Sequence, residues 1–174
     1  MTDLTLFSNK KRKETPRYIF ILAFAIISWI LQVSVVSRFL VLDTFPNILL
    51  LSTIYLGLTF GVEFGVLSGI IFAFLNTSIV YDHMFYFPLP LIGLISGLLA
   101  KNLFSDELLF FIVLSFLLTL PFEYLTGFQR NLNSSINITD RFLMISTYSA
   151  LLNLLIAPFF YLFMNLIAKN LKIR

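Results

Sequence analysis

Residues 44–81 read TFPNILLLSTIYLGLTFGVEFGVLSGIIFAFLNTSIVY and contain a single charged side chain, Glu63. A helix that crosses a membrane needs about 20 apolar residues, each adding 1.5 Å of length. The stretch is therefore long enough for two crossings, and Gly61–Phe64 leaves room only for a tight turn between them. These residues predict an antiparallel pair of membrane helices, because only helices satisfy their own backbone polar groups in a continuously apolar stretch.

The same pattern recurs along the whole chain. Six spans are expected at Tyr18–Ser37, Thr44–Val62, Phe64–Tyr81, His83–Ala100, Leu108–Phe128 and Phe142–Ala168, the fifth with one charge, Glu123. Strands of a membrane barrel are shorter and alternate apolar with polar residues, so a barrel is disfavoured. The predicted fold class is an all-α integral membrane protein, a bundle of six transmembrane helices over residues 17–170, with a disordered basic tail at 1–16 and a basic end at 171–174.

Composition excludes several other classes of protein. Of the 174 residues, 59% are hydrophobic and 12% are charged, and the mean hydropathy is +0.94. A soluble domain carries about 25% charged residues, and a chain of this size cannot bury so much apolar surface within itself. There is no cysteine, which excludes disulfides and thiolate metal sites, and the single histidine, His83, argues against a histidine-rich metal site.

Positive charge predicts the orientation. If the chain has six spans, nine cations lie on one side of the membrane: the basic residues before the first span, Lys101 and those of the C-terminus. Three lie on the other side: Arg38, Arg130 and Arg141. Basic residues favour the cytoplasmic side. Both termini are therefore expected in the cytoplasm, and the protein in a cell membrane as a multi-pass component.

Glycines and a few polar residues are the candidate functional residues within the spans. Small residues four apart let helix backbones approach closely. Such spacing indicates either packing within the chain or a docking face for a partner. The glycines with this spacing are Gly61, Gly65, Gly69, Gly93 and Gly97. The polar residues are expected to form interhelical hydrogen bonds: Gln32, Asn47, Asn76 and Asn153. Glu123 is expected near the outer interface beside Tyr124, with a polar contact inside the bundle or with a partner as the alternative.

The N-terminal basic run Lys10, Lys11, Arg12 and Lys13 fixes the orientation or contacts anionic lipid or an acidic cytoplasmic partner such as a filament. A net charge of +3 makes nucleic-acid binding improbable. No nucleophile elbow, zinc-protease motif or phosphate-binding loop occurs in the sequence. The expectation is therefore a protein without a catalytic role, cofactor or metal.

The order of these features resembles the MreD family of bacterial rod-shape membrane proteins. The resemblance is carried by the basic tail, Ile30-Leu31-Gln32, the segment Phe45–Leu51 with Pro46-Asn47, the stretch Gly65–Asn76, and the last span with Pro158. Many family members have aspartate where this chain has Asn76, and the aromatic turn Tyr81–Phe87 replaces a Gly-rich stretch. The resemblance implies a fold similar to the substrate-binding subunits of energy-coupling-factor transporters. It also implies membership of the peptidoglycan elongation complex, with an MreC-like bitopic protein as partner, linked to the MreB filament, RodA and a class B penicillin-binding protein.

Three functions stay open at this stage. The first is a scaffold and regulator of cell shape and peptidoglycan elongation, acting by lateral packing with other membrane proteins. The second is a substrate-binding membrane subunit of a vitamin or small-molecule uptake transporter, although the Ala-x-x-x-Ala docking patch of such subunits is absent from the first span. The third is a small membrane enzyme that uses Glu123 or the pair Asp82–His83.

Overall fold

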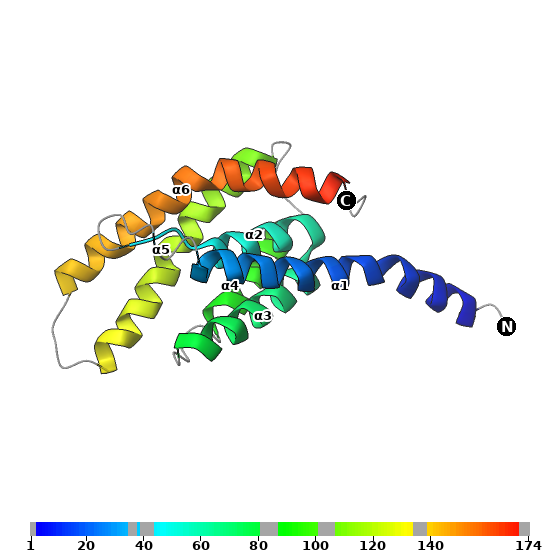
Figure 1. Cartoon of the computed structure of the whole chain (residues 1–174), viewed down its shortest axis with the longest axis horizontal. Coiled ribbons are helices and arrows are strands. Elements are labelled where there is room, and N and C mark those ends of the chain that lie inside the picture. Colours follow the sequence, from blue (N-terminus) through cyan, green and yellow to red (C-terminus); the bar gives the residue numbers. More distant parts are fainter. Residues whose placement is uncertain are drawn as a thin grey trace.

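The computed structural model describes residues 3–34, 38, 44–80, 87–100, 107–133 and 139–170, and all the elements in this part of the chain are helices. Their bounds are α1 Asp3–Ser34, α2 Ile48–Phe60, α3 Val62–Val80, α4 Pro88–Ala100, α5 Glu107–Asn133 and α6 Thr139–Asn170. Successive helices alternate in direction, so the start of α1 and the end of α6 lie at the same end of the molecule (Figure 1). The all-helical class is therefore confirmed for the described residues.

Several helix boundaries differ from those expected. Residues 3–16 belong to α1 and do not form the predicted disordered tail. Lysine, arginine and glutamate are good helix formers, and extending an existing helix avoids the cost of a new nucleus. α5 and α6 also run beyond the expected 108–128 and 142–168 at both ends, and α6 is continuous through Pro158.

α2 is shorter than the predicted span 44–62, because its start and end are set by local chemistry. Residues 44–47 are not helical, although Thr44 and Pro46 were expected within the span. Helical geometry is sterically disfavoured for the residue that precedes a proline, here Phe45 before Pro46. Asn47 then caps the helix, because its side chain accepts a hydrogen bond from the amide of Leu50 at 3.0 Å. Gly61 ends the helix with φ of +94°, a conformation that glycine adopts without strain.

α4 begins at Pro88, whereas the predicted span began at His83. Proline is well suited to the first turn of a helix, because the amide that it lacks would have no partner there. Residues 83–86 lie outside the described part of the chain.

Glycines bring α2, α3 and α4 into backbone contact. A Cβ atom added to Gly65 would overlap the carbonyl oxygen of Gly93, and one added to Gly93 would overlap that of Gly65. A Cβ at Gly69 would lie 2.6 Å from the carbonyl oxygen of Leu89, and one at Gly97 would overlap Val62. These four glycines therefore pack within the chain, which is the first of their two interpretations.

Gly61 is different from these four glycines. No heavy atom lies within 4 Å of the place that its Cβ would occupy. The positive φ of the turn between α2 and α3 is a reason for glycine at this position, and the backbone of Gly61 lies next to Gly97, since a Cβ added to Gly97 would come within 2.8 Å of it.

The hairpin of α5 and α6 joins the other helices mainly through α2. Three rings from α2, α5 and α6 meet there, with centroids 5.4 to 6.3 Å apart: Tyr55, Phe111 and Tyr161. The hydroxyl of Tyr161 also donates to a carboxylate oxygen of Glu107 at 2.8 Å. α1 contacts α2 and α3, and the indole N–H of Trp29 donates to the carbonyl of Leu75 at 3.0 Å.

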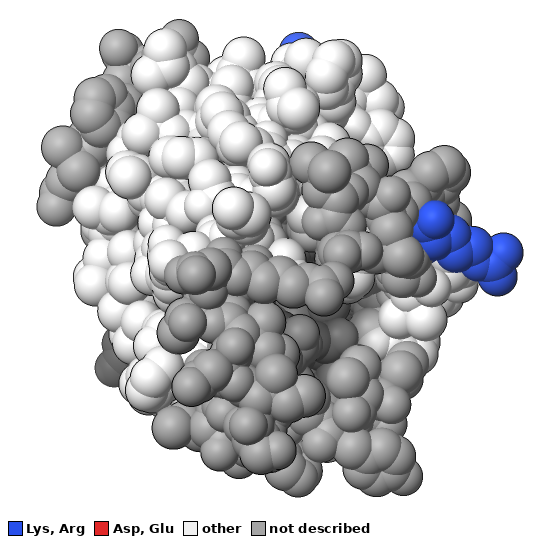
Figure 2. Space-filling model, turned by 90° about the vertical axis from the view of Figure 1, so that its left-hand side faces the viewer, with Lys and Arg blue, Asp and Glu red and all other residues white. Residues whose placement is uncertain are grey.

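Apolar side chains fill most of the interior and also cover much of the surface of the described part. Large apolar side chains point outward, among them Leu155 at 66% and Phe159 at 74% exposure. Seen from the left-hand side of Figure 1, the described surface is almost free of charge (Figure 2). Within the described residues, two helical segments are long and apolar enough to cross a membrane, Glu107–Thr126 and Leu143–Asn170.

Replacing Gly93 with alanine tests the backbone contact between α3 and α4. In an open helix position this change stabilises by about 1 kcal/mol, but here the new methyl group meets the backbone of Gly65. We expect Gly93→Ala to destabilise by about 1–3 kcal/mol, measured as a lower midpoint of thermal unfolding in detergent. The control is Leu94→Ala, an exposed neighbour, and a midpoint for Gly93→Ala at or above that of the unmodified protein would contradict the contact.

Candidate functional site

A cluster of uncharged polar side chains from α1, α5 and α6 lies in the interior around the start of α2. We call Gln32, Asn47, Thr119 and Asn153 the polar cluster. Three of these residues, Gln32, Thr119 and Asn153, are buried, and Asn47 is half-buried. The cluster brings together three of the predicted polar residues, which lie far apart in the sequence.

The polar cluster is centred on the N-terminal end of α2. The first amides of any helix have no partner within the helix. Here the amide of Asn47 donates to Asn153 Oδ1 at 2.7 Å, and the amide of Ile48 donates to Gln32 Oε1 at 2.8 Å. Gln32 Nε2 in turn donates to the carbonyl of Pro46 at 3.3 Å. Side chains from two other helices thus supply the hydrogen bonds that the non-helical segment 44–47 cannot make for itself.

Asn153 connects three helices. Its carbonyl oxygen accepts from the amide of Asn47, the residue that caps α2, while its Nδ2 donates to Thr119 Oγ1 on α5 at 3.0 Å. The hydroxyl of Thr119 then donates to the carbonyl of Ser115 at 2.6 Å. Because the side chain of Asn153 has no exposed surface, the loss of any of these partners would leave a buried polar group unsatisfied.

Glu123 lies one helical turn beyond Thr119 and extends the line of polar contacts between α5 and α6. Its carboxylate Oε1 accepts a hydrogen bond from Ser149 Oγ on α6 at 3.0 Å. The residue is half-buried. The bond to Ser149 is a polar contact between two helices of the bundle, of the kind that the alternative interpretation of Glu123 expects.

Sequence reasoning missed Thr119 and Ser149, the partners of Asn153 and Glu123. Both could have been found from helical spacing. Thr119 and Glu123 are four residues apart on α5, and Ser149 and Asn153 are four apart on α6, so each pair lies on one face of its helix.

Other predicted residues stand apart from the polar cluster or outside the described part. Asn76 belongs to α3 and Lys10, Lys11, Arg12 and Lys13 belong to α1, but their side chains are not among those described. The pair Asp82–His83 also lies outside the described residues. Gly65, Gly69, Gly93 and Gly97 lie in the contacts of α3 with α4.

The chemistry that the polar cluster offers is hydrogen bonding between neutral groups. Amide and hydroxyl side chains carry no proton that titrates near neutral pH. Among the described residues, no group of three or more histidine, cysteine, aspartate or glutamate side chains could hold a metal ion. What the geometry supports is the positioning of helices relative to one another.

The chain matches no family model, no curated protein and no solved structure.

Replacing Asn153 with leucine tests the polar cluster at its centre. Leucine fills a similar volume but cannot accept from the amide of Asn47, which is left without its partner. We expect Asn153→Leu to lower the free energy of unfolding by about 1–3 kcal/mol, which corresponds to roughly 2–4 °C in the thermal midpoint for each kcal/mol.

The matched control is Thr147→Val on the same helix. The hydroxyl of Thr147 is exposed and bonds only to the carbonyl of Leu143 one turn earlier, so its loss should change stability by less than about 0.5 kcal/mol. Equal stability of the Asn153→Leu and Thr147→Val proteins would show that the polar cluster does not hold the helices together.

Proposed function

We propose that this chain is a multi-pass protein of the bacterial cell membrane, with six crossings and both termini in the cytoplasm. We propose further that it acts as a non-catalytic scaffold and regulator of cell shape and peptidoglycan elongation, as its resemblance to the MreD family implies. Its partner would be an MreC-like bitopic protein, through which it joins the MreB filament, RodA and a class B penicillin-binding protein.

The observation that carries the proposed membrane location is the apolar surface of α5 and α6, together with the polar side chains buried inside the bundle. Leucine and phenylalanine side chains cover the outside of α5 and α6, while the buried positions include serine, threonine and asparagine. In water this arrangement would expose a large apolar surface without compensation. In a bilayer it is favourable, because lipid tails cover the apolar side chains and the polar groups satisfy one another inside.

The short helix α2 is compatible with a complete crossing. Its 13 residues rise only about 20 Å, against about 30 Å for the hydrocarbon layer. The segment 44–47 that precedes it is not helical, and at about 3.3 Å per residue it adds the missing length. Non-helical backbone is tolerated at membrane depth where it is buried in protein, and Gln32 and Asn153 supply the hydrogen bonds that such a segment needs.

Two observations support a scaffold. The segment Phe45–Leu51, which carries much of the resemblance to MreD, includes the residues that the polar cluster holds at the start of α2. The polar side chains of the cluster are hydrogen-bonded between helices and to the backbone. A helical bundle with an apolar exterior is suited to lateral contact with other membrane helices.

The proposed orientation can be tested directly, because the chain has no cysteine. Single substitutions Arg38→Cys and Lys101→Cys place one thiol on each expected side of the membrane. In intact cells a membrane-impermeant maleimide should label the first and not the second, which should react only after the cells are opened. Labelling of Lys101→Cys in intact cells, or recovery of the protein in the soluble fraction, would contradict six crossings with cytoplasmic termini.

The proposed role is tested in the native host by deletion and affinity capture. A strain without this protein should lose its normal shape, and the unmodified chain or the Thr147→Val variant should restore it. Capture of the tagged chain from detergent should recover an MreC-like bitopic protein. Unchanged cell shape together with a tightly bound small molecule in the purified protein would favour the uptake subunit.

A further inference from the structure

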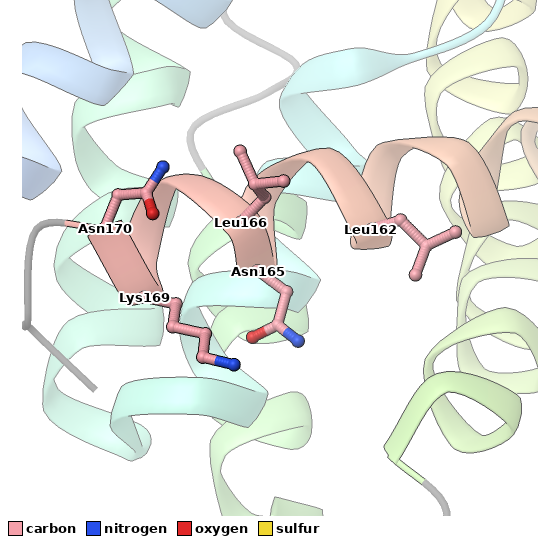
Figure 3. A pocket seen from close by; sticks show the side chains of 5 residues that line it. All are labelled: Leu162, Asn165, Leu166, Lys169 and Asn170. Carbon is pink, nitrogen blue, oxygen red and sulfur yellow. The ribbon is translucent and has the colours of Figure 1, made fainter.

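The cytoplasmic end of α6, on the proposed orientation, carries an open groove of about 640 Å³. Five described residues of the last turns of α6 line it: Leu162, Asn165, Leu166, Lys169 and Asn170. Figure 3 shows Asn165 and Lys169 leaving the same side of the helix, one turn apart, whereas Leu166 and Asn170 leave the opposite side. The groove has the size of a site for a small molecule or for part of a larger one.

The lining of the groove changes in a fixed order along the helix. Leu162 is exposed and apolar, Asn165 follows three residues later with an amide, and Lys169 follows four residues after that with an ammonium group. At 1.5 Å per residue, the change from apolar to cationic takes about 10 Å. This is the distance over which a phospholipid changes from acyl chain through ester groups to phosphate.

We propose that this groove binds an anionic phospholipid. The inference rests on the membrane location proposed above, which places Lys169 at the cytoplasmic surface, the side where anionic lipids concentrate. Lys169 would pair with the phosphate, and the amide of Asn165 would donate to an ester carbonyl. Leu162 would contact the start of an acyl chain. A free phosphate could use Lys169 but not Leu162, so the groove as a whole fits the lipid.

Charge complementarity sets the lipid class. Lys169 lies in the last turn of α6 and is the one basic residue there, and no acidic residue lines the groove among those described. A cation next to a membrane surface contributes about fivefold to the binding of an anionic lipid. Phosphatidylglycerol should therefore bind more tightly than zwitterionic phosphatidylcholine, which carries the same phosphate with a neutralising ammonium group.

Native mass spectrometry of the full-length protein in detergent measures this preference. The delipidated protein is titrated with phosphatidylglycerol or phosphatidylcholine of the same acyl chains. The unmodified protein should bind phosphatidylglycerol more tightly, and Lys169→Gln should lower this preference about fivefold while leaving phosphatidylcholine binding unchanged. The control Arg38→Gln removes an exposed cation that lies four residues beyond the end of α1 in the sequence and should retain the preference.

A second variant tests the apolar part of the groove. Leu162→Asn should weaken both lipids alike, because it removes the contact with the acyl chain and leaves the charge. Leu162 and Lys169 are both exposed, so we expect the Leu162→Asn and Lys169→Gln proteins to keep the helical circular dichroism of the unmodified protein. This measurement checks that the two variants are folded.

Four results would overturn the proposal. The first two are equal binding of the two lipids by the unmodified protein, and an equal loss of the phosphatidylglycerol preference in the Arg38→Gln and Lys169→Gln proteins. The third is full displacement of the lipid by inorganic phosphate. The fourth is unchanged lipid binding by the Lys169→Gln protein together with weaker capture of a protein partner. The last would assign the groove to a protein. None of them affects the maleimide labelling that tests the membrane location, so the two proposals can fail separately.

Discussion

The hydrogen bond from the amide of Asn47 to the side chain of Asn153 is the contact on which the rest of the arrangement depends. The chain enters α2 through four non-helical residues, and their polar groups need partners in an interior otherwise filled with apolar side chains. Asn153 meets this need and at the same time binds Thr119 on α5. One carboxamide thus joins the α5–α6 hairpin to the start of α2, because its two ends have opposite hydrogen-bonding character.

Two kinds of packing hold the molecule together, and they respond differently to change. α2, α3 and α4 are in backbone contact through glycines, so a methyl group added at Gly93 would overlap the backbone of Gly65. The contact of α2 with α5 and α6 is made by rings and polar side chains, among them Tyr55, Phe111 and Asn153. Side chains can adjust their rotamers where backbones cannot. We therefore infer that the three-helix part is the more rigid of the two.

The sequence alone predicts the helical class and the six helices of the described residues, but neither the helix boundaries nor the partners of the polar side chains. Charge-free stretches mark the helices, and glycine spacing predicts close packing at Gly65 and Gly93. The start of α2 differs from the expected position because capping by Asn47 and the constraint from Pro46 outweigh the apolar pattern. The polar cluster was predicted only as separate residues, since the partner of a buried amide depends on how the helices are arranged in space, which one sequence does not reveal.

The bond between Trp29 and the carbonyl of Leu75 has a practical consequence. Trp29 is the only tryptophan in the chain, so the intrinsic fluorescence of the whole protein arises from a single indole at the contact of α1 with α3. Its emission spectrum is therefore a built-in optical reporter of whether α1 is seated against its neighbours, and it needs no label and no mutation.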